Sequence, residues 1–214
     1  MLSVVLPTLN AAATLPFCLA ALGDADEIIV ADGGSADATR PIAQAAGARV
    51  VEAPRGRGVQ LRAGAAAARG DWLLFLHADT MLGEGWRAAV DAHAAAAPDK
   101  AACFRFRLDD ASWQARLIER GVALRRFPYG DQGLLLSRAF YDALGGYRAL
   151  PLMEDVDLVR RIGRRRLRML DISAVTSAER WRRDGWLRRS ARNLGLLALY
   201  RLGASPERLA KLYG

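Results

Sequence analysis

The feature that most constrains the fold is the alternation of short apolar runs with helix-forming stretches over the first hundred residues. Residues 2–7, 27–31, 48–52 and 72–76 are short runs of apolar, often β-branched side chains. Such runs suit parallel strands that are buried on both faces. Because helical stretches separate them, the pattern predicts a doubly wound α/β fold with a mostly parallel sheet flanked by helices.

The remaining elements follow from local signals. Asn10 is expected to cap a helix over residues 11–22, and Gly70 is expected to end a helix over residues 58–69. The other predicted helices are 35–47, 112–125, 139–144, 154–163 and most of 178–214, and the other predicted strands are 101–108 and 133–137. No repeat or linker interrupts the 214 residues, so we expect a single domain.

The positive charge lies in the last part of the chain. Residues 156–214 carry 15 Lys or Arg and 5 Asp or Glu, whereas the whole chain has a net charge of +8. Leu187, Ala191, Leu194 and Ala198 recur there at helical spacing, with arginines between them. Two interpretations stay open: a helix that lies on an anionic membrane surface, or one that packs on the domain with its arginines in solvent.

No run approaches the roughly 20 apolar residues that a membrane-spanning helix needs, and Met1 leads at once into the first predicted strand. We therefore expect a cytoplasmic protein, with peripheral contact at the inner face of the membrane as an open alternative. Cys18 and Cys103 lie in unrelated contexts, so we expect two free, buried thiols.

Polar or small residues directly follow three predicted strands, at 7–10, 32–34 and 77–79. In doubly wound sheets, ligands bind beyond the carboxyl ends of the strands. Asp79 is therefore a candidate ligand for Mg²⁺ or Mn²⁺, with diphosphate oxygens and water completing the coordination. A turn or helix-capping role explains the same aspartate. His77 is a candidate to orient or coordinate the metal, and a histidine held in place by hydrogen bonds is the alternative.

Two more segments suggest nucleotide contacts. Asp32 is a candidate acceptor for a nucleobase N–H, and Gly33 permits close backbone approach, although an ordinary Asp-Gly turn explains the pair as well. Arg55, Arg57 and Arg62 bracket the Gly-rich entry to a predicted helix, where phosphate binds readily. A solvated basic surface is the alternative for these arginines.

Glu154 and Asp155 begin another predicted helix. The helix dipole favours acids at this position, so a structural role is sufficient to explain them. The functional hypothesis is that Asp155 acts as a general base that removes the proton of an acceptor hydroxyl.

Four motifs occur in order: Val-Val-Leu-Pro-Thr-Leu-Asn at 4–10, Ile-Ile-Val-Ala-Asp-Gly-Gly-Ser at 28–35, Leu-Phe-Leu-His-Ala-Asp-Thr at 74–80 and Met-Glu-Asp-Val-Asp-Leu at 153–158. Together they resemble the motifs of family 2 glycosyltransferases of the GT-A fold, which is Rossmann-like. Segments 56–62, 130–133 and 179–186 are similar to a bacterial subgroup of that family with a His-Ala-Asp metal motif. With these segments the resemblance covers nearly the whole chain.

The resemblance implies an inverting, metal-dependent transfer of a sugar from a nucleotide-diphosphate sugar (a UDP-sugar or GDP-sugar) to the hydroxyl of an unidentified acceptor. It implies Asp155 as the base with Glu154 beside it, and Asp79 as the last acid of an Asp-X-Asp motif whose first acid is replaced by His77. The nucleotide-binding residues it implies are Pro7, Thr8, Asn10, Asp32, Gly33, Arg57, Gln60 and Arg62. It also implies an acceptor or donor-sugar region at Gly130, Asp131 and Gln132.

Within the single domain we expect a nucleotide-binding half at 1–100, an acceptor half at 101–178 and a basic helical tail at 179–214. Two other functions stay open. A sugar-phosphate nucleotidyltransferase can share the α/β nucleotide-binding half. A non-enzymatic nucleic-acid binder would use the basic tail and its tryptophans, but the tail lacks a recognisable reading motif, so no nucleic-acid partner is expected.

Overall fold

The computed structural model describes residues 1–125 and 130–213. These residues form one eight-stranded sheet in the order β3-β2-β1-β4-β7-β6-β8-β5. The strands are β1 (Leu2–Thr8), β2 (Glu27–Asp32), β3 (Arg49–Glu52), β4 (Trp72–Phe75), β5 (Thr80–Leu82), β6 (Ala101–Leu108), β7 (Leu134–Ser137) and β8 (Leu167–Thr176). The first four in chain order are parallel, whereas β7 runs antiparallel to both β4 and β6. The predicted mixed, mostly parallel sheet is confirmed.

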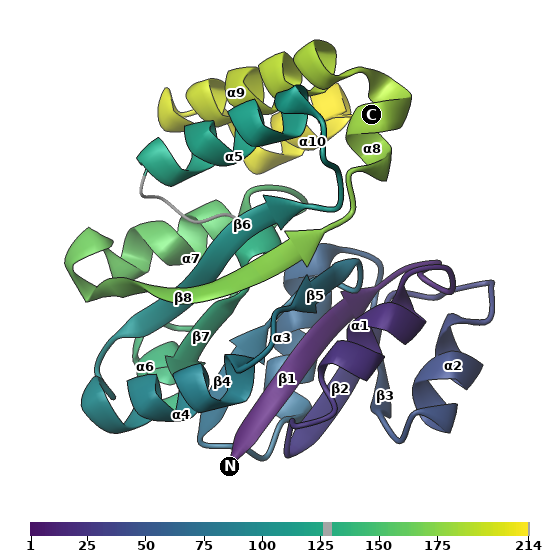
Figure 1. The fold of residues 1–214 in the computed structure, drawn as a ribbon, viewed down its shortest axis with the longest axis vertical. Coiled ribbons are helices and arrows are strands. Elements are labelled where there is room, and N and C mark those ends of the chain that lie inside the picture. Colours follow the sequence, from purple (N-terminus) through teal and green to yellow (C-terminus); the bar gives the residue numbers. More distant parts are fainter. Residues whose placement is uncertain (126–129, 214) are drawn as a thin grey trace.

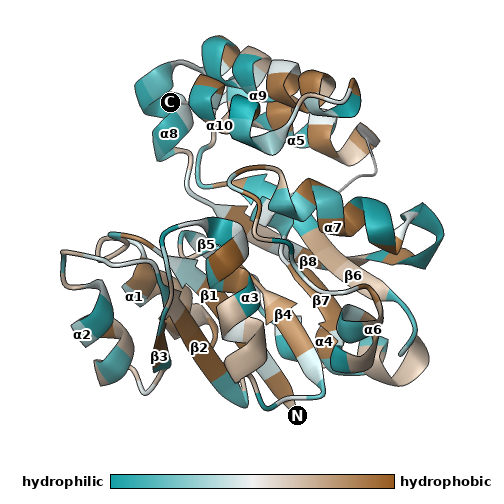
Figure 2. Cartoon of the chain, turned by 180° about the vertical axis from the view of Figure 1, so that it is seen from behind, coloured by the Kyte–Doolittle hydropathy of each residue, from teal (hydrophilic) through white to brown (hydrophobic). Residues whose placement is uncertain are grey.

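Helices cover both faces of the sheet. One face is packed by α1 (Leu15–Ala21), α2 (Thr39–Ala45) and α4 (Trp86–Ala96), and the other by α3 (Arg57–Ala67), α6 (Arg138–Ala143) and α7 (Glu154–Ile162). The strands between them are the most hydrophobic part of the ribbon (Figure 2). Burial of these apolar side chains on both faces is the main stabilising contribution, since each contributes in proportion to the area removed from water.

A third group of helices lies beyond one end of the sheet. It contains α5 (Trp113–Arg125), α8 (Glu179–Asp184), α9 (Trp186–Arg201) and α10 (Pro206–Tyr213). Figure 1 shows these helices stacked above the ends of β6 and β8, with the C terminus among them and the N terminus at the opposite end of the molecule. Phe106 and Leu108 of β6 pack there against Ala115 of α5 and Trp181 of α8.

Two glycines of helix α3 allow close approach, one to the sheet and one to a later segment of the chain. A Cβ on Gly64 would collide with the side chain of Val5 in β1. A Cβ on Gly58 would collide with the backbone carbonyl of Arg148. The second contact brings the N-terminus of α3 against the segment that leads into α7, and so draws two distant parts of the chain together.

Two expectations about local structure need correction. Asn10 does not cap a helix: its backbone has a φ of 52°, its Oδ1 accepts a hydrogen bond from the Ala36 N–H, and α1 begins only at Leu15. Gly70 does not end α3, which stops at Ala67. A glycine is required at position 70 for another reason, because a Cβ there would lie 2.7 Å from the Ser3 nitrogen of β1.

Two strands, β5 and the ten-residue β8, are not among the predicted elements. The first half of β8, residues 167–171, carries polar and partly exposed side chains, so it lacks the apolar signal of a buried strand. β8 pairs in parallel with β6 and antiparallel with β5. Its pairing with two partners, rather than its own side chains, explains why this segment is a strand.

Candidate functional site

The carboxyl ends of β1 and β2 meet side by side, with Thr8 paired to Asp32. The Asp32 carboxylate is fully buried and accepts hydrogen bonds from Thr8, Gly34, Ser35 and Arg40. Burial opposes its ionisation, but these donors outweigh burial and lower the pKa of Asp32 to about 2. Asp32 is therefore ionised and organises the loop that follows β2.

Gln60 and Gly33 stabilise the ends of β1 and β2 and the loops that follow them. The buried Gln60 amide donates to the Thr8 carbonyl at 2.6 Å and to the Ala31 carbonyl at 2.9 Å. Gly33 is needed beside it, since a Cβ there would lie 2.9 Å from Gln60 Nε2. Gln60 thus holds the ends of β1 and β2 together, and its amide donors are already used within the protein.

The third polar turn, residues 77–79, follows β4 and contacts residues 130–131, which are distant in the sequence. His77 Nδ1 lies 2.8 Å from Asp131 Oδ1, and the Gly130 N–H donates to Asp155 Oδ2 at 2.7 Å. Gly130 separates the two side chains: a Cβ there would lie 2.7 Å from His77 Nε2 and 3.2 Å from Asp155 Oδ2. Burial opposes ionisation of Asp131, but the hydrogen bond and charge of His77 outweigh burial and lower the pKa of Asp131 to about 2.

Helix α7 places its first two acids at this junction. Met153 precedes them with a left-handed backbone (φ 66°), a conformation that a non-glycine residue adopts at some cost in free energy. Glu154 is 1% exposed, and its Oε1 lies 3.4 Å from Arg57 Nη1 without hydrogen-bond geometry. Burial raises the pKa of Glu154, although the charge of Arg57 opposes this shift. The pKa of Arg57 is also raised: burial opposes this shift, but the charges of Glu154 and other nearby acids outweigh burial. The close approach of Gly58 to Arg148 brings the start of α3, which carries Arg57, next to the start of α7, which carries Glu154.

Asp79 carries an atom with an unusual environment. Its Oδ1 is buried and has no hydrogen-bond partner. A buried carboxylate oxygen without a donor is costly, so a bound cation would relieve that cost. Nearby, burial and the charge of Asp79 raise the pKa of the Cys18 thiol to about 12, which keeps it neutral. Cys18 and Cys103 are both free and buried, as predicted.

Within residues 1–125 and 130–213, no three His, Cys, Asp or Glu side chains come together as a ready-made metal cage. His77 already contacts Asp131 through Nδ1. A site with one protein carboxylate and exogenous oxygen ligands is compatible with this arrangement, because Mg²⁺ commonly keeps several ligands from water and substrate phosphates.

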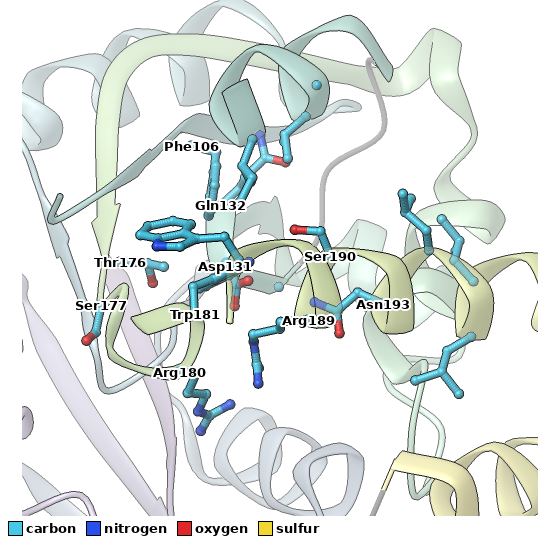
Figure 3. Close-up of a pocket in the computed structure, with 18 of the residues that line it drawn as sticks. Phe106, Asp131, Gln132, Thr176, Ser177, Arg180, Trp181, Arg189, Ser190 and Asn193 are labelled. Carbon is cyan, nitrogen blue, oxygen red and sulfur yellow. The ribbon is translucent and has the colours of Figure 1, made fainter. Parts of the chain in front are cut away.

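A cavity of about 820 Å³ joins these groups. It is lined at one end by Arg57, Asp79, Gly130, Asp131, Gln132, Glu154 and Asp155. Figure 3 looks into it and shows Asp131 and Gln132 facing residues of α8 and α9, among them Arg180 and Arg189. The cavity therefore unites the predicted metal, base and sugar-region residues, whereas Pro7, Thr8, Asn10, Asp32, Gly33, Gln60, Arg62 and His77 are not among its lining residues.

The cavity is also lined by Thr176, Ser177 and Arg180, which are not among the predicted site residues. Thr176 ends β8 and Ser177 follows it. The hydroxyls of Thr176 and Thr80 share a hydrogen bond, and the Ser177 N–H donates to the Asp79 carbonyl at 3.2 Å. Because β8 itself was missed, its end next to Asp79 was missed with it. Arg180 lies in segment 179–186, and the resemblance of that segment to a family 2 subgroup is the only sequence signal that points to Arg180.

We expect Gly130→Ala to impair the site more than the fold. The added Cβ would displace the His77 ring or the Asp155 carboxylate, and overpacking of this kind typically costs about 1–3 kcal/mol. Turnover should fall at least about tenfold, measured beside the thermal unfolding midpoint. Gly195→Ala is the matched control, because a Cβ there meets no atom within 4 Å. Equal turnover in both variants would contradict the role assigned to Gly130.

Comparison with known proteins places the chain in a family. The model of glycosyl transferase family 2 matches residues 3–150. A PGL/p-HBAD biosynthesis glycosyltransferase of Mycobacterium tuberculosis is 40% identical over 96 residues, which cover 39% of this chain and 37% of that protein, and a Mycobacterium bovis counterpart gives the same values. The matched region thus spans little more than a third of these relatives.

Solved structures show the same fold. Glucosyl-3-phosphoglycerate synthase from Mycobacterium tuberculosis, in complex with Mn²⁺ and UDP-glucose, has a TM-score of 0.59 at 22% identity, covering 82% of this chain and 71% of that one. The complex with Mg²⁺ and UDP has a TM-score of 0.58 at 23% identity, with coverage of 81% and 69%. The fold is that of the GT-A glycosyltransferases, as predicted. The chain belongs to glycosyl transferase family 2.

Proposed function

We propose that this protein transfers a sugar from a nucleotide-diphosphate sugar to an acceptor hydroxyl, with inversion at the anomeric carbon. The observation that carries the proposal is that one cavity contains both Asp79, with its unpartnered buried oxygen, and the half-buried carboxylate of Asp155. These residues come from separate motifs, so the tertiary fold brings a candidate metal ligand and a candidate base to the same space.

The donor nucleoside is proposed to lie over the ends of β1 and β2, outside that cavity. Thr8 and Asp32 would form its floor, with Pro7, Asn10 and Gly33 shaping the loops around it. UDP in the structural neighbours favours a UDP-sugar over a GDP-sugar. Because hydrogen bonds within the protein already occupy Asp32, a base would reach it only after a neighbour such as Arg40 or Ser35 shifts.

A divalent cation, Mn²⁺ or Mg²⁺, fits the Asp79 oxygen, and the neighbouring structures contain these ions. When bound, it would supply charge neutralisation for the leaving diphosphate. Arg57 and Arg180 line the same cavity and would contribute to that neutralisation as well. The role of His77 is proposed as orienting, since Asp131 holds its ring.

The residues of the chain suggest the following step. Asp155, positioned by the Gly130 N–H, accepts the proton of the acceptor hydroxyl. The hydroxyl oxygen forms a bond to the anomeric carbon from the face opposite the diphosphate. The bond between that carbon and the diphosphate oxygen breaks, and its electron pair leaves with the diphosphate. Glu154 is too buried to receive the proton as directly, and it holds Arg57 in place.

The halves predicted from sequence are retained as a proposal, with one addition. Residues 1–100 would bind the nucleotide and residues 101–178 the acceptor. The tail at 179–214 also lines the cavity through α8 and α9, so we propose that it forms part of the acceptor site.

Titration calorimetry with a panel of nucleoside diphosphates, with and without Mn²⁺, tests the proposal. We expect tight, Mn²⁺-dependent binding of UDP. A sugar-phosphate nucleotidyltransferase would instead release pyrophosphate from a nucleoside triphosphate and a sugar phosphate. Family membership argues against that alternative and against a nucleic-acid binder. Failure of every diphosphate to bind would contradict the proposed donor site.

Membrane contact remains a separate proposal. No helix of the described chain is long and apolar enough to cross a membrane. In α9, Arg189 is buried against Asp184 and Trp181, so it cannot reach a membrane. Leu199 and Leu202, at the end of the same helix, are exposed and do not line the cavity. We propose a peripheral contact at the inner face of the membrane through this exposed surface.

At low salt the protein is expected to co-sediment with vesicles of phosphatidylcholine and phosphatidylglycerol. Binding should fall in 0.5 M salt because the charge attraction is screened. Arg201→Glu, at the end of α9 and outside the cavity lining, should weaken sedimentation severalfold, and Arg105→Glu, at an exposed position of β6, serves as the charge-matched control. Equal sedimentation with pure phosphatidylcholine would contradict the electrostatic part of this proposal.

A further inference from the structure

The cavity has two chemically different ends. The carboxylates of Asp79, Asp131 and Asp155 lie at one end. The other end is lined by α5 and α9, mainly with apolar side chains, among them Trp113, Leu117 and Ile118 of α5 and Trp186, Leu187 and Leu194 of α9. Helix α9 also contributes polar side chains to this lining, namely Arg188, Arg189, Ser190 and Asn193 (Figure 3). We call this second end the apolar chamber.

The core of the protein does not account for the apolar chamber. Trp113 is 70% exposed, Leu117 58% and Leu187 80%. These side chains face open space although they line a cavity, which leaves a contiguous apolar surface in contact with water. Soluble proteins rarely keep such a surface without a ligand or partner for it.

The sugar donor does not account for it either. A nucleotide-diphosphate sugar is polar throughout, and the residues proposed for its nucleoside are not among those that line the cavity. The volume of about 820 Å³ lies within the usual range for small-molecule sites and is too small for a folded partner. The chamber is also continuous with the space beside Asp155, where the acceptor hydroxyl is expected.

From these three observations we infer that the acceptor is an amphiphile. Its hydroxyl-bearing head would lie at Asp155, and its apolar portion would occupy the chamber lined by α5 and α9. The inference rests on the proposed function, because it assigns the substrate class of the same site. Hydrophobic burial of the apolar portion would supply much of the binding, and the carboxylate end would set its orientation.

Gly121 offers a way to fill the chamber without disturbing the fold. It lies on α5 among the lining residues, at helical spacing from Gln114, Leu117 and Ile118. A Cβ there meets no atom within 4 Å, and any ordinary residue suits a helix better than glycine. Gly121→Phe should therefore occupy the chamber. Gly195→Phe is the matched control, since Gly195 is an exposed helical glycine of α9 that does not line the cavity.

Octyl β-glucoside and methyl β-glucoside serve as probes, because they share a head group and differ in the apolar tail. Three of the five tryptophans, Trp113, Trp181 and Trp186, line the cavity, so tryptophan fluorescence reports binding. Below its micelle concentration, octyl β-glucoside should bind saturably and methyl β-glucoside at least tenfold more weakly. Gly121→Phe should weaken octyl β-glucoside at least tenfold, whereas Gly195→Phe should match the wild type.

Binding of UDP with Mn²⁺ is measured in the same samples to separate the two proposals. Unchanged UDP binding in Gly121→Phe, together with loss of octyl β-glucoside binding, supports the inference. Equal affinity for the two glucosides, or undiminished octyl β-glucoside binding in Gly121→Phe, would overturn it while leaving the donor site intact. Failure of the wild type to bind UDP would contradict the proposed function, and the glucoside comparison would still decide whether the chamber takes an apolar group.

Discussion

Asp155→Asn is expected to lower kcat for sugar transfer by about 10²–10⁴-fold, the usual contribution of a positioned general base. Asparagine keeps the size of the side chain and an oxygen that can accept the Gly130 N–H, which now bonds to Asp155 Oδ2 at 2.7 Å. The local backbone should therefore stay in place. The amide cannot accept the proton of the acceptor hydroxyl, so the chemical step alone should suffer.

The measurement is kcat in steady state beside the Kd for UDP with Mn²⁺. We expect the Kd of Asp155→Asn to remain within about threefold of wild type, since the nucleoside loops lie elsewhere. Asp142→Asn, which changes an exposed carboxylate on α6, is the control and should retain full turnover. Near-normal turnover in Asp155→Asn, with a severe loss in Glu154→Gln, would transfer the role of base to Glu154.

Asp79→Asn is expected to remove the dependence of UDP binding on Mn²⁺. Loss of even an outer-shell partner of a metal ligand costs 10–100-fold in metal affinity, so loss of the ligand itself should cost at least about 100-fold. Without metal, the variant should be as stable as the wild type or more stable. The change removes the negative charge at an unpartnered buried oxygen, which is worth about 1 kcal/mol or a rise of about 2–4 °C in Tm.

Thermal unfolding with and without UDP and Mn²⁺ checks both parts. Ligand binding to the folded state should raise the Tm of the wild type, and the Mn²⁺-dependent part of that rise should vanish in Asp79→Asn. Asp24→Asn alters an exposed carboxylate and should behave as the wild type. A lower Tm in metal-free Asp79→Asn would show that Asp79 is structural, as a turn or capping aspartate would be.

Local sequence signals were sufficient for the first half of the fold. The strands β1 to β4 were all predicted to within two residues at each end, because buried parallel strands carry continuous apolar runs. The ligand-binding edge stays a prediction from the same strands, since parallel strands end at the same side of a sheet. His77, Asp79 and Asp155 were singled out by their motifs, and the structure places Asp79 and Asp155 in one cavity.

Other features depend on contacts between distant residues, and the sequence by itself did not reveal them. β8 is a strand because β6 and β5 pair with it. Asn10 does not cap a helix, because its side chain accepts a hydrogen bond from the Ala36 N–H in the loop after β2. Gly130 is required because His77 and Asp155 approach it from both sides.

The sequence by itself thus determined the α/β class, the edge of the sheet that the polar turns follow and the identity of the motif residues, since each depends on periodicity or on residues adjacent in the chain. Only the tertiary structure decided that apolar side chains of α5 and α9 line the same cavity as Asp155. The apolar residues of these helices show the spacing of any surface helix. Whether such a stripe is buried against the core or left open around a cavity depends on the packing of helices far apart in sequence.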